Sequence, residues 1–193
     1  MKKIGNKELA GIGLLSAIVI ILQFIGSSIK LGVFSVSLVL IPIVIGGALY
    51  GISAGGFLGV IFGLTVLISG DAAAFLAINP AGAVITVLLK GFLCGIAAPA
   101  VFLGLKKYGQ TKAVMASALA CPVVNTGVFL LCCTVFFMDT IRMWAQGAGF
   151  GDNAAAYMIV GFVGLNFLFE VIVNVVLCPA VLKIIKVVNK GRY

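Results

Sequence analysis

Two charged residues of opposite sign lie deep inside apolar stretches of the sequence. Lys90 follows TVLL and precedes GFLCGIAAPAVFLGL, and Glu170 lies within NFLFEVIVN. A charged side chain at the centre of a membrane-spanning helix costs roughly 2.5–3.5 kcal/mol on insertion scales, so one that is retained normally faces protein or a water-filled cavity and has a partner. We therefore expect Lys90 and Glu170 to form the polar centre of the molecule.

Asparagines accompany both charges at matching depths. Asn166, Glu170 and Asn174 recur at intervals of four, which places them on one face of a helix. Lys90 follows a proline by ten residues, so it lies about 15 Å below the outer end of its helix, and Asn125 lies about 20 Å from the inner end of the next one. These side chains are therefore expected at similar heights.

Two interpretations of this polar centre stay open. In the first, Lys90 and Glu170 form a buried ion pair that fixes the arrangement of their helices, and the asparagines satisfy the remaining donors and acceptors. In the second, the polar side chains line an outward-opening pocket for a small polar metabolite. The candidate pocket residues are Asn79, Lys90, Asn125, Asn166 and Glu170.

Two further features belong to polar connections between the apolar stretches. Trp144, together with Phe150 in a glycine-rich segment, is either a lid over the pocket or an aromatic anchor at the membrane interface. Asp71 is expected to be a solvated loop residue.

The overall composition predicts a helical membrane protein. Of the 193 residues, 63% are hydrophobic and 9% charged, and the mean hydropathy is +1.30; a soluble domain is far less apolar. The net charge of +8 comes from basic residues between apolar spans, where positive charge sets membrane orientation, so nucleic acid is not an expected partner.

Cysteine and histidine usage argues against catalysis and metal binding. The five cysteines lie in apolar segments without CxxC spacing, and the sequence has no histidine. This removes Ser-His and His-metal chemistry and disfavours a zinc site or a redox pair. The cysteines are expected to be buried, inert thiols. We expect no enzyme activity and no cofactor.

Six apolar spans position these residues in a single membrane domain over residues 1–193. A spanning helix needs about 20 apolar residues, and spans two and three are short for this. The expected spans are about 9–27, 38–50, 54–68, 80–105, 113–138 and 157–188. Asn79 and Pro80 have the residue types of an N-cap and a first helical position at the start of span four.

The distribution of Lys and Arg predicts that both termini are cytoplasmic. Lys30 and Arg142 fall on the outer side. The opposite side has Lys2, Lys3, Lys7, Lys106, Lys107, Lys112, Lys183, Lys186, Lys190 and Arg192. The longer polar connections, 26–37, 69–79 and 139–156, then all face outward, where a ligand could enter.

Small residues predict two sites of close helix packing. Ala10, Gly13 and Ala17 leave one stripe of span one without bulk, suited either to packing within this bundle or to docking against another subunit. Glycines crowd spans two and three and permit close packing of this hairpin.

No sequence signal indicates an energy source of the chain's own. There is no GxxxxGK[ST] motif, and no chain of acidic residues and histidines suited to a proton relay. If the chain transports a solute, it borrows energy from a partner or moves the solute passively. A stand-alone secondary transporter or channel is the alternative to transport with borrowed energy, but no repeat relates 1–100 to 101–193. A scaffold without ligand is a third hypothesis.

One long apolar stretch reads VSLVLIPIVIGGALYGISAGGFLGVIFGLTVLISG. It is followed by an outer loop and then by AINP, with a basic residue eleven positions after the Asn. This arrangement resembles the substrate-binding S component of energy-coupling-factor (ECF) vitamin transporters. The size, the six spans and Gly13-xxx-Ala17 in place of that family's AxxxA are also similar. Within the family the chain looks most like the pantothenate-type members, with Lys90 where arginine is expected.

The resemblance implies high-affinity capture of a vitamin or precursor in an outward pocket, with a pantothenate-like anion favoured. It also implies partners: a transmembrane T subunit, onto which the first span docks, and two cytoplasmic ATPases. The expected location is the plasma membrane of a prokaryote.

Overall fold

Six apolar helices make up most of the chain. The computed structural model describes residues 5–31, 34–35 and 37–190. Within them, the apolar helices are α1 (Asn6–Ser27), α2 (Leu40–Tyr50), α3 (Ile52–Ile68), α5 (Pro80–Leu105), α6 (Gln110–Phe136) and α9 (Gly164–Lys190). Four helical stretches are long and apolar enough to cross a membrane, and α2 and α3 are shorter. The predicted all-α membrane fold is confirmed; the single-domain assignment stays a prediction.

Shorter elements connect these helices. The connection after α1 contains the antiparallel strands β1 (Lys30–Leu31) and β2 (Phe34–Ser35). Two connections expected as loops contain helices, α4 (Ala73–Ile78) and the strongly amphipathic α7 (Met138–Gly147). The remaining elements are a 3₁₀ turn at Lys106–Tyr108, α8 (Ala154–Ala156) and a π-helical segment at Tyr157–Phe162.

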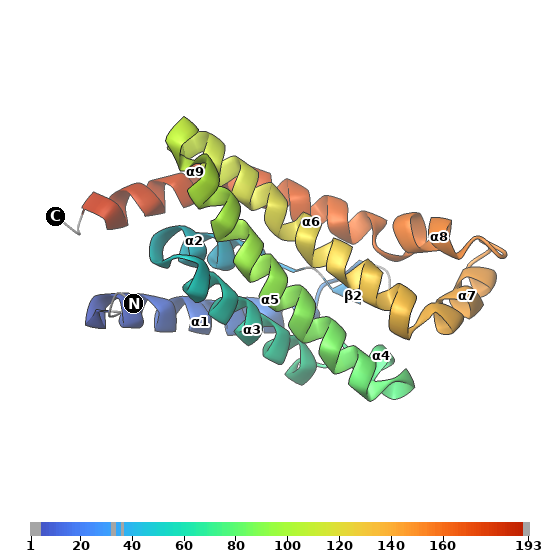
Figure 1. Cartoon of the computed structure of the whole chain (residues 1–193). Coiled ribbons are helices and arrows are strands. Elements are labelled where there is room, and N and C mark those ends of the chain that lie inside the picture. Colours follow the sequence, from blue (N-terminus) through green and yellow to red (C-terminus); the bar gives the residue numbers. More distant parts are fainter. Residues whose placement is uncertain (1–4, 32–33, 36, 191–193) are drawn as a thin grey trace.

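The two chain termini lie at the same end of the bundle, as the distribution of Lys and Arg predicts. α1 begins and α9 ends at the same end of the molecule, and α4, α7 and α8 lie at the opposite end (Figure 1). This arrangement agrees with both termini on one side of the membrane. Lys2, Lys3 and Arg192, which contribute to that prediction, lie outside the described residues.

Glycines allow α3 and α5 to pack backbone against backbone. Gly55 and Gly59 of α3 face Gly91 and Gly95 of α5, where an added Cβ would meet a carbonyl oxygen of the opposite helix. These glycines were expected to pack α2 against α3, but their partner is α5. Only glycine permits so close an approach, and this contact fixes the helix that carries Lys90.

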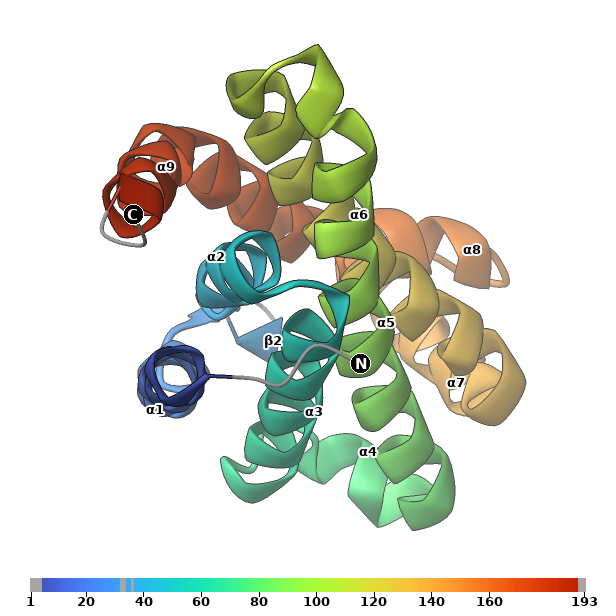
Figure 2. The ribbon, with the colours of Figure 1, turned by 60° about the vertical axis from the view of Figure 1, so that its left-hand side comes forward.

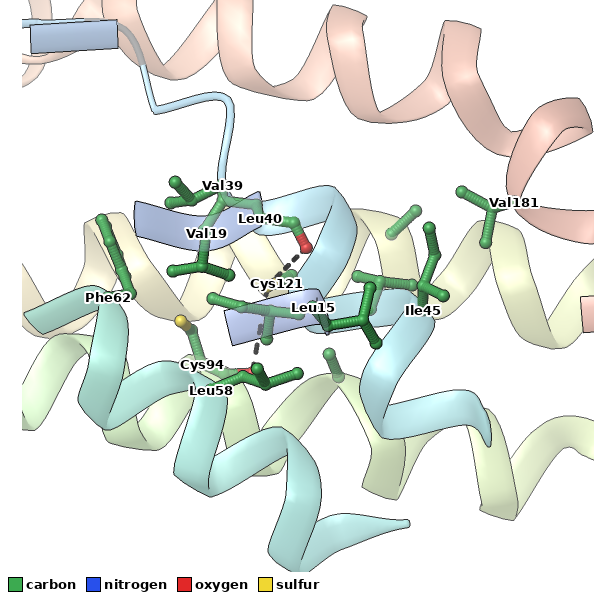
Figure 3. Close-up of a cluster of buried hydrophobic side chains, with 14 of the residues drawn as sticks. Leu15, Val19, Val39, Leu40, Ile45, Leu58, Phe62, Cys94, Cys121 and Val181 are labelled. Atoms are coloured by element: carbon green, nitrogen blue, oxygen red, sulfur yellow. Dashed lines mark hydrogen bonds between the residues drawn. The ribbon is translucent and has the colours of Figure 1, made fainter. Parts of the chain in front are cut away.

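The centre of the bundle is apolar and closely packed. Figure 3 shows side chains from α1, α2, α3, α5 and α6 meeting there. The Cys121 thiol lies 3.9 Å from the Cys94 carbonyl oxygen and 4.0 Å from that of Leu40, so it links α6 to both α5 and α2. All five cysteines are buried free thiols, which confirms their expected burial.

α1 lies at the edge of the bundle. It packs mainly against α2 and α3, with a smaller contact to β2, and leaves one side of its circumference open (Figure 2). Its buried positions, Ile12, Leu15, Val19 and Gln23, recur every three or four residues and so form one stripe.

Candidate functional site

A cavity between α5, α6 and α9 brings together four of the predicted pocket residues. Lys90, Asn125, Asn166 and Glu170 all line it. The other lining residues are Ser37, Asp71, Thr126, Phe129, Val163 and Phe167. Because Ser37 and Asp71 belong to connections at the outer ends of their helices, the cavity lies toward the outer side of the bundle.

The cavity is narrow in this structure. It leaves about 40 Å³ for the centres of water molecules, which is room for a few waters, whereas ligand pockets typically measure 300–1,000 Å³. Binding a vitamin-sized molecule therefore requires the surrounding elements to move apart.

The π-helical segment precedes the part of α9 that lines the cavity. In this segment the Val163 N–H donates to the Met158 carbonyl oxygen, five residues earlier, at 3.2 Å. The extra residue in the turn sets the register of the helix that follows. Val163, Asn166 and Glu170 then share the face that lines the cavity; π-helical turns are frequent at functional sites.

Aromatic rings hold the Lys90 side chain. Its Nζ lies 5.4 Å from the centroid of the Phe62 ring of α3 and 5.4 Å from that of Phe129 of α6. A cation over the face of an aromatic ring gains roughly 0.5–2 kcal/mol, more when it is removed from water. Phe62 and Phe129 thus stabilise this charge within the bundle and direct it along the cavity wall.

Glu170 is a buried acceptor. The residue is 4% exposed. Three groups lie within hydrogen-bonding reach of its carboxyl group: the Ser37 hydroxyl, the Ser37 backbone N–H and the Asn125 amide. No ion pair within 4.0 Å joins it to Lys90, and its Oε2 has no hydrogen-bond partner among the described residues. Lys90 and Glu170 therefore face one cavity without forming the direct ion pair of the first interpretation.

The asparagines differ in what they contact. Asn125 is 3% exposed and lines the cavity, and its Oδ1 accepts no hydrogen bond from the described part of the chain. Asn166 lines the same cavity. Asn174 donates from Nδ2 to the backbone carbonyl of Glu170 at 2.7 Å and is not a lining residue.

Asn79 and Trp144 lie outside the cavity wall. Asn79 caps α5, accepting a hydrogen bond from the Gly82 N–H at 2.9 Å. Trp144 of α7 packs edge-on against Phe75, with ring centroids 5.8 Å apart. The roles of Asn79 and Trp144 in binding stay predictions, and both residues have a packing or capping contact that accounts for their position.

The small-residue stripe of α1 faces away from the bundle. Ala10, Gly13 and Ala17 are exposed, and a Cβ added at Gly13 would meet no atom within 4 Å. Gly11, on the opposite face, packs against the Tyr50 side chain. The stripe therefore makes no close helix contact within the described residues, which leaves docking against another subunit as its predicted role.

Sequence reasoning misses several residues of the cavity. Asp71 was expected to be solvated, but it is half-buried and lines the cavity, because the buried Gln23 of α1 donates from Nε2 to its Oδ2 at 3.2 Å. Ser37, Thr126 and Phe129 also line the wall. Phe129 follows Asn125 by four residues on α6, a signal that helical spacing provides. Nothing in the spacing points to Ser37, Asp71 or Thr126.

The comparison with protein families decides the identity of this bundle. The family model described as ECF transporter, substrate-specific component matches residues 7–182. The chain belongs to this family. Comparisons with curated proteins and with solved structures give no match. As an ECF substrate-specific component it is a multi-pass membrane protein and a transport component, and the predicted resemblance is confirmed. The matched range contains all six apolar helices up to Leu182 of α9 and every residue of the cavity.

Proposed function

We propose that this ECF component captures a vitamin or vitamin precursor from outside the cell and delivers it to an ATP-driven importer. Its partners would be a transmembrane T subunit and two cytoplasmic ATPases, in the plasma membrane of a prokaryote. The observation that carries the proposal is the cavity, in which Lys90, Asn125, Asn166 and Glu170 converge near the outer side of the bundle. Buried polar groups that converge in this way are a basis for specific recognition of a polar ligand.

Lys90 is the residue to which we assign the anionic group of the ligand. A carboxylate in a poorly hydrated site gains roughly 1.5–3 kcal/mol from a charge-assisted hydrogen bond to an ammonium group. The pantothenate-like anion favoured by the sequence would contact Lys90 in this way. Phe62 and Phe129 contact the ammonium group, which makes no direct ion pair with Glu170 and so stays available to a ligand.

The exposed stripe of α1 supports docking of a partner. Ala10, Gly13 and Ala17 are small exposed residues of α1, a helix at the edge of the bundle (Figure 2). In lipid, such stripes let two helices approach closely. The T subunit is the partner that the family implies for this surface.

Reconstitution of the chain alone into sealed vesicles tests the function. The expected result is saturable binding of radiolabelled ligand, at most one molecule per chain, without accumulation inside the vesicle, because the sequence has no ATP-binding motif. Accumulation driven by an ion gradient would replace this account with the alternative of a secondary transporter.

A further inference from the structure

The described wall of the cavity has acidic as well as basic side chains. Among the described lining residues, Lys90 is the one basic side chain, whereas Asp71 and Glu170 are both acidic. A cavity built for a simple anion would be expected to have a surplus of positive charge or of N–H donors, because like charges repel strongly where water is scarce. The Glu170 carboxylate beside Lys90 therefore calls for a positively charged or donor-rich group in the ligand, in addition to an acceptor for Lys90.

The carboxylate of Asp71 is held in place from another helix. Gln23 of α1 is 1% exposed, and its Nε2 lies 3.2 Å from Asp71 Oδ2 and 3.5 Å from Ser69 Oγ. A buried amide directed at an acidic side chain fixes its orientation. Asp71 is thus a positioned member of the wall.

Two buried acceptors in the wall lack donors. Glu170 Oε2 and Asn125 Oδ1 are each without a hydrogen-bond partner among the residues that the structure describes, although both residues are more than nine-tenths buried. Buried polar atoms are nearly always hydrogen-bonded, and an unpaired one is costly. Because both residues line the same cavity, a donor entering it can satisfy them together.

The position of Lys90 leaves these acceptors available. Its Nζ lies over the rings of Phe62 and Phe129 and makes no ion pair within 4.0 Å in the described part of the chain. The aromatic contacts stabilise the ammonium group without using a carboxylate. The cavity wall therefore offers both a cation and unpaired acceptors.

From this arrangement we infer that the ligand is zwitterionic: its acidic group faces Lys90, and a protonated nitrogen donates to Glu170 and Asn125. Phe129, Val163 and Phe167 line the same cavity and would contact the carbon skeleton of the ligand. This inference rests on the proposed capture of a small molecule through Lys90, and it replaces the pantothenate-like anion with a zwitterion as the substrate class. It separates the ligand from pantothenate, which has a carboxylate but no basic nitrogen.

Probe pairs in which the nitrogen is basic in one member and acylated in the other test the inference. L-tryptophan is compared with N-acetyl-L-tryptophan, and β-alanine is compared with pantothenate, its N-acylated derivative. The readout is the melting temperature of the purified chain in detergent at millimolar probe, together with accurate-mass identification of any molecule that co-purifies. We expect a zwitterion to raise the melting temperature or to co-purify, and its N-acyl partner to do neither.

Glu170→Gln separates the alternatives because it keeps the size of the side chain and removes its charge. For a zwitterion the affinity should fall about tenfold or more, since a charge-assisted hydrogen bond is lost. For a simple anion, removing a negative charge beside Lys90 should leave binding equal or tighter. Asp139→Asn, at an exposed position of α7 outside the cavity, is the matched control and should leave binding unchanged.

The results distinguish failure of the zwitterion assignment from failure of the capture function. Stabilisation by pantothenate that Glu170→Gln preserves or strengthens would overturn the zwitterion assignment and leave the capture function standing. If no molecule co-purifies and no probe stabilises the chain, the result counts against the zwitterion assignment and against the capture function.

Discussion

The ammonium group of Lys90 lies 5.4 Å from the centroid of the Phe129 ring, and both residues line the same cavity. The contact joins α5 to α6 and gives the charge a partner that is not a carboxylate. Glu170, which lines the same cavity, is left as an acceptor without a direct ion pair to Lys90. The two deep charges are therefore better explained as recognition groups than as a structural pair.

This explanation predicts weak coupling between Lys90 and Glu170 in stability. A direct buried pair would make each single mutant strongly destabilised, by 3–5 kcal/mol, and the double mutant would recover. For Lys90→Met and Glu170→Gln, thermal and denaturant unfolding without ligand should instead give a coupling energy below about 1 kcal/mol. A coupling of several kcal/mol would restore the ion-pair interpretation.

The exposed stripe of α1 predicts a defect confined to transport. Gly13→Leu or Ala17→Leu should lower uptake in cells while ligand binding stays intact and the free energy of unfolding changes by less than about 0.5 kcal/mol. Gly11→Leu, two residues away, is the contrasting variant: its side chain would meet the Tyr50 ring and should destabilise the bundle. If Gly13→Leu impairs folding or binding as much as Gly11→Leu does, the stripe belongs to the interior of the bundle.

The glycine contact between α3 and α5 predicts a large effect of a single methyl group. Gly59→Ala places a Cβ against the Gly91 carbonyl, and overpacking of this kind typically costs about 1–3 kcal/mol of stability. It should also weaken ligand binding, because Gly91 is the neighbour of Lys90. Gly104→Ala, in the partner helix α5 and with no atom within 4 Å of the added Cβ, should be neutral or stabilising by up to about 1 kcal/mol. Equal melting temperatures for the two variants would contradict the close approach.

The hydrogen bond between Gln23 and Asp71 predicts a link from α1 to the cavity. Gln23→Leu removes the donor with little change in size, so it should lower stability by about 1–3 kcal/mol and weaken ligand binding several-fold. The matched control is Gln146→Leu, because Gln146 also donates to an aspartate, Asp152, at 3.1 Å but in an exposed connection. Titration calorimetry measures the ligand affinity of both variants. An equal loss of affinity in both would show that the Gln23–Asp71 hydrogen bond has no specific role in binding.

Helical periodicity accounts for what the sequence predicts correctly. The span from Pro80 to Leu105 is confirmed at both ends, since Asn79 caps it and lysines follow it. The depths of Lys90 and Asn125 follow from helical rise, and Asn166 and Glu170 share a face because they are four residues apart. These rules suffice to bring four polar residues into one cavity wall.

The residues that sequence reasoning misses belong to connections or depend on non-helical register. Asp71 reaches the cavity because Gln23, 48 positions earlier in the chain, binds it, and no local pattern encodes such a contact. The segment around Trp144 reads as a polar loop but forms α7, whose polar and apolar residues alternate with helical spacing. The partner of the α3 glycines is likewise a tertiary property, since the spacing of glycines gives the packing face and not the helix that covers it.

Native mass spectrometry of the detergent-purified chain is the most direct measurement of the central claim, that this cavity captures a small molecule through Lys90. The wild-type protein is compared with Lys90→Met and with Lys107→Met, which removes an exposed lysine at the opposite end of the bundle. The account predicts a bound small molecule in the wild type and in Lys107→Met, and a loss of tenfold or more in affinity in Lys90→Met. Equal occupancy in Lys90→Met and the wild type would contradict it.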